Sequence, residues 1–97
     1  MARKTGNMKV FYDPEFLTKL KNVDVRIRHR VKDRMLIFSK NHHDPQLNNH
    51  SLKREYQGYR SINITADFRA LYKEVDIGDE KVAYFVLLGT HTELYKP

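Results

Sequence analysis

The chain has 97 residues, which is enough for one domain with a modest hydrophobic core. Hydrophobic residues make up 40% of it and charged residues 31%, a balance that excludes a disordered chain. The formal net charge of +6 favours a polyanionic partner such as nucleic acid, an acidic protein or an anionic membrane surface, although such a charge also serves solubility alone. We expect residues 1–97 to form one domain, with residues 1–7 flexible.

Cysteine is absent, which excludes disulfides, thiol nucleophiles and thiolate metal sites. The same absence fits a reducing cytoplasm, where we expect the protein to act. No apolar run approaches the roughly 20 residues needed to span a bilayer, and no apolar segment of a secretory signal follows the basic N-terminus. The sequence therefore predicts no membrane partner.

The first forty residues predict a strand over 9–12 and two helices. Asp13 and Pro14 suit the N-cap and first position of a helix over 14–21, and Asp24 can cap a second helix over 25–40. Apolar residues recur in the second helix at spacings typical of one buried face, at Ile27, Val31, Met35 and Phe38. Its cations lie elsewhere, at Arg26, Arg28, Arg30, Lys32 and Arg34. They form a solvated face or contact an acidic partner or RNA.

The loop after this helix contains His42, His43 and Asp44, and the following Pro45 ends the helix. Neighbouring loop residues rarely aim at one ion, and no further ligand follows at a recognisable spacing. No metal site is therefore predicted.

From His50 onward apolar and polar residues alternate, which predicts strands over 51–54, 59–64, 68–75 and 81–88. Turns are expected at 57–58 and 66–67, and a polar hairpin loop at 76–80. The segment 81–88 is the most apolar, so we expect it to be central in the sheet. This order predicts an α+β fold, in which an antiparallel β-sheet of four to five strands packs against two N-terminal helices and the first strand lies beside the last.

Several short motifs follow one another in this part of the chain: His50, the tripeptide Gly58-Tyr59-Arg60, ADFRALY from Ala66, and GTHTELY from Gly89. At these positions the sequence resembles toxins of the RelE/ParE superfamily, most closely the YafQ-like branch. The resemblance covers about residues 8–95 in the same order of elements. It implies a RelE-like, microbial RNase-like fold.

The resemblance also implies a toxin of a type II toxin–antitoxin system, with a cognate antitoxin as its partner. Members of the branch cleave mRNA in the ribosomal A site without a metal or other cofactor. By position, His50, Asp67 and His91 match catalytic residues of the branch, and Tyr95 matches a catalytic aromatic position. Arg69 matches a functional arginine of the wider RelE group.

One position departs from the branch, which typically has a further histidine where this chain has Asn63. Asparagine forms hydrogen bonds but cannot exchange a proton near neutrality. Either Asn63 only positions the phosphate, or the protein is slower, or it is not a nuclease.

Metal-free RNA cleavage uses the neighbouring 2′-hydroxyl as nucleophile, so it needs a base, an acid and cations around the phosphate. Histidine suits both proton roles because its unperturbed pKa, about 6.5, lies near working pH. We expect His50 and His91 to share these roles, with the assignment open, and Asp67 to orient or charge a histidine.

The remaining candidates would hold the RNA. Arg60 and Arg69 would clamp the phosphate, because guanidinium forks match its oxygens. Tyr95 would stack on a base or donate its hydroxyl. Lys53 and Arg54 would hold the RNA backbone.

Each of these residues also has a simpler explanation. His50 suits a surface loop, Asp67 a turn and Tyr95 a core anchor for the C-terminus. The superfamily includes members that poison gyrase, so a non-catalytic or gyrase-directed toxin is the alternative function. A plain RNA-binding module is a weaker one, because the sequence lacks the aromatic-rich sheet motif of common single-strand RNA binders.

Overall fold

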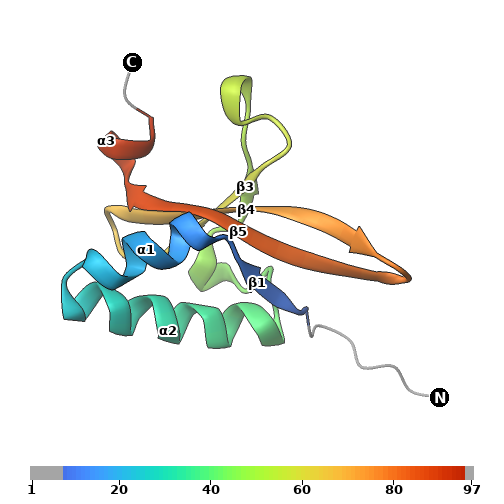
Figure 1. The fold of residues 1–97 in the computed structure, drawn as a ribbon, viewed down its shortest axis with the longest axis horizontal. Coiled ribbons are helices and arrows are strands. Elements are labelled where there is room, and N and C mark those ends of the chain that lie inside the picture. Colours follow the sequence, from blue (N-terminus) through green and yellow to red (C-terminus); the bar gives the residue numbers. More distant parts are fainter. Residues whose placement is uncertain (1–7, 96–97) are drawn as a thin grey trace.

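A computed structural model describes residues 8–95, and the flexibility predicted for residues 1–7 lies outside them. Five strands form one sheet in the spatial order β1-β5-β4-β3-β2 (Figure 1). They are β1 (Val10–Tyr12), β2 (His50–Ser51), β3 (Arg60–Asn63), β4 (Phe68–Ile77) and β5 (Glu80–Thr90). β2 to β5 pair antiparallel, whereas β1 pairs parallel with β5, so the sheet is mixed. The predicted α+β class is confirmed, as is the first strand's place beside the last.

Two helices, α1 (Pro14–Asn22) and α2 (Val25–Lys40), cover one face of this sheet (Figure 1). Both begin at the predicted caps. The Asp13 carboxylate accepts a hydrogen bond from the Glu15 N–H at 2.9 Å, and that of Asp24 accepts one from the Arg26 N–H at 2.7 Å. Each cap satisfies an N–H group that has no partner within the helix.

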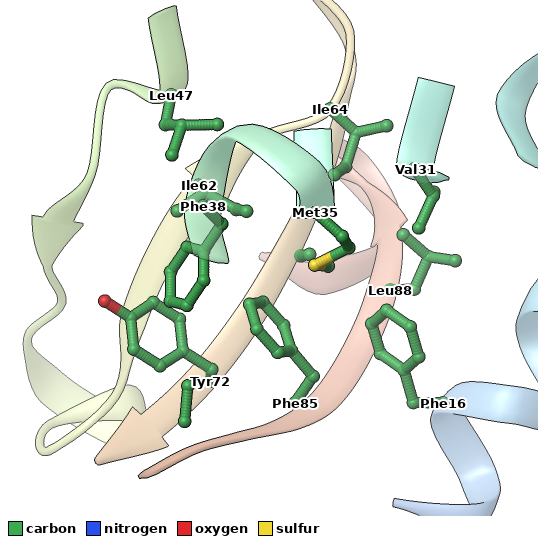
Figure 2. Packing of buried hydrophobic residues seen from close by; sticks show 12 residues of the cluster. Phe16, Val31, Met35, Phe38, Leu47, Ile62, Ile64, Tyr72, Phe85 and Leu88 are labelled. Carbon is green, nitrogen blue, oxygen red and sulfur yellow. The ribbon is translucent and has the colours of Figure 1, made fainter. Parts of the chain in front are cut away.

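The hydrophobic core lies between the two helices and the sheet (Figure 2). The Phe38 ring of α2 meets Tyr72 and Phe85 edge-on, with ring centroids 5.0 and 5.2 Å apart. Ile62 of β3 and Ala70 of β4 are buried in the same cluster. Because side chains alternate along a strand, the residues between them in β3 and β4 face the side that α1 and α2 leave uncovered.

The strand predicted over 51–54 is wrong in its extent. β2 contains only His50 and Ser51, and Arg54–Tyr56 form a short 3-10 helix. Arg54 adopts a left-handed backbone conformation (φ 60°), which ends the extended run. A hydrogen bond from the Leu52 N–H to the Tyr59 carbonyl, 3.0 Å long, closes the excursion at its base. Residues 52–59, which we name the lobe, therefore rise from the sheet (Figure 1).

A third helix, α3 (His91–Leu94), was not predicted. It follows β5 directly and stands on the same side of the sheet as the lobe (Figure 1). Its start is a capping box in which Thr90 and Glu93 each bind the other's backbone N–H. None of the helices within residues 8–95 has the length and apolarity that a membrane crossing requires.

Candidate active site

A hollow of about 310 Å³ opens on the sheet face that α1 and α2 do not cover. This volume lies at the small end of the range for ligand pockets, roughly 300–1,000 Å³. We name it the histidine hollow, and its lining residues are Asn48, His50, Leu52, Ser61, Arg69, His91 and Tyr95. The fold thus brings together four predicted site residues from β2, β4 and the α3 region.

The hydrogen bond of His50 fixes its neutral tautomer. Its Nδ1 lies 3.0 Å from the carbonyl oxygen of Asn48, and a carbonyl can only accept, so Nδ1 carries the proton. Nε2 then carries the lone pair. Asn48 presents this carbonyl from a left-handed conformation (φ 49°), which asparagine tolerates better than most residues. His50 is therefore prepared to accept a proton at Nε2.

His91 and Tyr95 reach the hollow from α3 and its C-terminal cap, and their rings lie 4.8 Å apart. Contacts on two sides hold this short helix. The His91 N–H donates to the Asp67 carbonyl at 3.0 Å, and the Tyr56 hydroxyl from the lobe donates to the Leu94 carbonyl at 2.9 Å. The Tyr56 and Tyr95 rings also meet edge-on at 5.6 Å. These contacts fix the position of α3 relative to the lobe and the β3–β4 turn.

The guanidinium of Arg69 is held by the turn that precedes it. Its Nη1 donates to the carbonyls of Thr65, Ala66 and Phe68 at 3.1, 2.8 and 3.3 Å. Within residues 8–95, Nε and Nη2 make no hydrogen bond, so part of the fork is available to an anion. No acidic side chain of the described residues lines the hollow to compete for it.

Asp67 and Asn63 lie near the hollow but do not line it. The Asp67 side chain is exposed, and its carboxylate forms no hydrogen bond or ion pair within the described part of the chain. Its contact with His91 runs through its backbone carbonyl. Asn63 is paired in register with Arg69, and its buried Oδ1 has no hydrogen-bond partner among residues 8–95.

The structure does not bring Arg60 to the histidine hollow. Its side chain shares the core-facing side of β3, and its Nε donates to Asn49 Oδ1 at 2.8 Å. It lines a separate hollow of about 340 Å³. Lys53 and Arg54 are exposed on the lobe, outside the histidine hollow. Their roles toward RNA stay predictions.

Sequence reasoning missed three lining residues, Asn48, Leu52 and Ser61. Ser61 was within reach of prediction, because it alternates with Ile62 and must face away from the core. Its register with His50 could not be known before the short β2 was placed. In residues 8–95, no group of three or more His, Asp or Glu side chains is arranged to hold a metal ion.

A larger apolar groove of about 550 Å³ lies on the helix side of the sheet, between β1 and α2. We name it the β1–α2 groove. Val10, Val31, Met35 and Leu36 contribute its apolar surface, and Lys9, Arg28 and Lys32 contribute cations. Leu36 is 58% exposed although it is a large apolar residue.

No family model matches the sequence, and no curated protein matches it. Solved structures do match. The YoeB/ParE toxin from Agrobacterium tumefaciens aligns with a TM-score of 0.69 and 21% identity over 87% of this chain and 99% of that one. YafQ from E. coli aligns with a TM-score of 0.69 and 22% identity over 92% and 99%. The E. coli DinJ-YafQ toxin-antitoxin complex gives the same TM-score and identity over 92% and 98%. This protein therefore has the fold of the YoeB/ParE and YafQ toxins, which is the fold that its resemblance to the RelE/ParE superfamily predicted.

Proposed function

We propose that this protein is the toxin of a type II toxin–antitoxin system and cleaves mRNA on the ribosome without a metal. The observation that carries the proposal is the histidine hollow, in which two imidazoles, a guanidinium and a tyrosine line one small cavity. The net charge of +6 supports it, because a basic protein attracts polyanions. The fold shared with YafQ and YoeB/ParE toxins supports it as an analogy.

In the proposed reaction His50 is the base and His91 the acid. The Nε2 lone pair of His50 takes the proton of the 2′-hydroxyl, and the 2′-oxygen attacks the adjacent phosphorus. The bond from phosphorus to the 5′-oxygen breaks, and that oxygen takes a proton from protonated His91. The products are a 2′,3′-cyclic phosphate and a 5′-hydroxyl. The tautomer of His50 supports this assignment, because its Nε2 is the nitrogen with a lone pair.

The other lining residues assist this reaction. The Arg69 nitrogens that the turn does not engage stabilise the charge on the phosphorane. Tyr95 stacks on a base or donates its hydroxyl, and its packing against Tyr56 holds the ring in place. Asp67 orients His91 through the backbone contact with its N–H. The RNA backbone outside the hollow is held by the remaining candidates, Lys53, Arg54, Arg60 and Asn63.

The test is brief expression in bacteria, followed by mapping of mRNA ends. We expect growth arrest and new 5′-hydroxyl ends within reading frames, and His50→Ala and His91→Ala should abolish both while remaining folded. His29→Ala is the matched control, because His29 is exposed on α2, away from the hollow. Growth arrest with intact transcripts, or full toxicity of both histidine variants, favours a gyrase-directed or other binding toxin instead.

We further propose that an acidic antitoxin docks in the β1–α2 groove. A groove with an apolar floor and a basic rim suits an amphipathic segment that carries acidic residues. The exposed Leu36 provides an apolar contact for it. The DinJ-YafQ toxin-antitoxin complex, whose structure is similar, supports a protein partner of this kind.

A further inference from the structure

Ser61 carries a buried hydroxyl group that has no hydrogen-bond partner in the described part of the chain. The residue is 0% exposed, and its Oγ makes no hydrogen bond within residues 8–95. Most buried polar groups in proteins are hydrogen-bonded, because leaving one unpaired destabilises the fold. Ser61 is also the only fully buried polar residue of the described chain. An unpaired hydroxyl at such a position calls for a specific explanation.

The position of this hydroxyl points to a ligand. Ser61 lines the histidine hollow, but its hydroxyl is closed to solvent, so a ligand reaches it from the hollow only when a covering side chain turns aside. Ser61 pairs in register with His50 on β2 and with Leu71 on β4. Arg69 precedes Leu71 by two residues, so its side chain lies on the same face of β4. Side chains paired in this way lie side by side on one face of a sheet. Ser61 therefore lies between the imidazole of His50 and the β4 strand that carries the Arg69 guanidinium.

We infer that the Ser61 hydroxyl donates a hydrogen bond to a non-bridging oxygen of the scissile phosphate. The inference rests on the proposed function. It places the scissile phosphate between His50, the base that deprotonates the adjacent 2′-hydroxyl, and Arg69, which neutralises the charge of the phosphate. The Ser61 side chain contributes one donor and no charge. It therefore adds a directional contact to the ionic contact of Arg69.

The unpaired hydroxyl separates this role from a structural one. If Ser61 served only packing, Ser61→Ala would be neutral for cleavage, and removal of a buried unpaired hydroxyl would keep or raise the melting temperature. If Ser61 binds the phosphate, the same variant keeps or gains stability but loses activity. Stability and activity then change independently. A misfolded variant would instead lose both.

The experiment is single-turnover cleavage of a programmed ribosome–mRNA complex by wild-type protein and Ser61→Ala, after the cleavage site has been mapped. We expect Ser61→Ala to be about 10- to 100-fold slower, the usual effect of one hydrogen bond to a charged group. The substrate is then made with sulfur in place of each non-bridging oxygen in turn. Sulfur is a weak acceptor, so with one of the two diastereomers the rate difference between wild type and Ser61→Ala should shrink to nearly nothing.

Ser51→Ala is the matched control, because Ser51 is an exposed serine next to His50 that does not line the hollow. It should cleave at the wild-type rate. A Ser61→Ala protein that also cleaves at that rate, or that is slower but keeps its full defect on both sulfur substrates, overturns the inference and leaves the proposed function standing. Wild-type protein that leaves the mRNA intact overturns the proposed function, and the inference with it.

Discussion

At the scale of single residues, the proposed function makes His50 the base, because its Nδ1 donates to the Asn48 carbonyl and leaves the lone pair on Nε2. A base must be deprotonated to act, so base catalysis predicts a cleavage rate that rises with pH. We predict that His50→Gln lowers the single-turnover rate by about 10²- to 10⁴-fold and removes this rise, because general base catalysis is worth that much. The rate is measured from pH 5 to 9.

The control for this assignment is the other histidine. His91→Gln should keep the rise at low pH and remove the fall at high pH, where an acid loses the proton that it must donate. His29 lies on the exposed surface of α2, so His29→Gln should keep both the rise of the rate at low pH and its fall at high pH. If His50→Gln keeps the rise, His50 is not the base.

His42 belongs to the fold and gives stability a pH dependence of its own. Partial burial and, to a smaller extent, the neighbouring His43 lower the pKa of His42. The unfolded chain therefore takes up this proton at a higher pH, near 6.5, than the folded protein does. Stability is complete above that value and declines as the pH falls through it toward the lowered pKa.

We predict that His42→Leu flattens this decline between pH 8 and 5. Leucine suits the site because the His42 ring packs on Phe38, with centroids 5.7 Å apart, and its buried Nδ1 has no partner among residues 8–95. Urea unfolding at several pH values measures the effect. The exposed His29→Leu should keep the wild-type slope, and an unchanged slope in His42→Leu would show that other groups cause the decline.

At the scale of elements, α3 determines where His91 and Tyr95 lie. A four-residue helix has little stability of its own, so its capping box carries much of its order. Glu93 accepts from the Thr90 N–H at 2.9 Å and from Lys19 of α1 at 3.2 Å, and these contacts lower its pKa. Gly89 leaves room for this carboxylate, since a β-carbon there would lie 2.9 Å from Glu93 Oε1.

We predict that Thr90→Ala costs about 1 kcal/mol of stability, the usual loss for an N-cap, and slows cleavage because His91 loses its fixed position. Denaturant unfolding and single-turnover cleavage measure the two effects. Thr92→Ala, exposed on the same helix and outside the capping box, should change neither. Cleavage by Thr90→Ala at the wild-type rate would mean that α3 keeps its place without the cap.

The elements also differ in how well the sequence predicted them. Helices α1 and α2 were predicted nearly to the residue, because Asp13 and Asp24 mark their starts and apolar spacing marks their buried faces. The extent of β2 and the lobe were not predicted. A strand of two residues is too short to show an alternating pattern, and no sequence signal marks the left-handed conformation of Arg54. α3 did have a signal, the Thr90-x-x-Glu93 pattern, in a segment otherwise too short to show helical periodicity.

The candidate site was predictable in four of its seven lining residues but not in its geometry. His50, Arg69, His91 and Tyr95 were identified from the resemblance, and all four line one hollow. Arg60 was assigned to the phosphate although its alternation with Ile62 places it on the core side, where it binds Asn49. Alternation with Ile62 indicates the face on which Ser61 lies, but only its register with His50 and its burial distinguish it from other strand serines.

At the scale of the whole molecule, the sheet separates two sites. The histidine hollow opens on one face, and the β1–α2 groove lies on the other, where the helices pack. An antitoxin seated in the groove therefore has to reach around the molecule, or lower the affinity for the ribosome by charge, to silence the hollow. Under the proposed function, either route would make the groove a contact for neutralisation that catalysis itself does not need.

We therefore predict that Leu36→Asp weakens binding of the antitoxin, taken as the product of the adjacent reading frame, by about 10- to 100-fold. The change places a negative charge against an acidic partner and removes an exposed apolar contact. Leu36 is exposed, so folding and mRNA cleavage should stay at wild-type levels. Calorimetric titration measures the affinity, and co-expression shows whether the antitoxin still prevents growth arrest. Leu17→Asp is the matched control, since Leu17 is similarly exposed on α1 outside the groove. If both variants bind as tightly as wild type, the antitoxin docks on another face of the toxin.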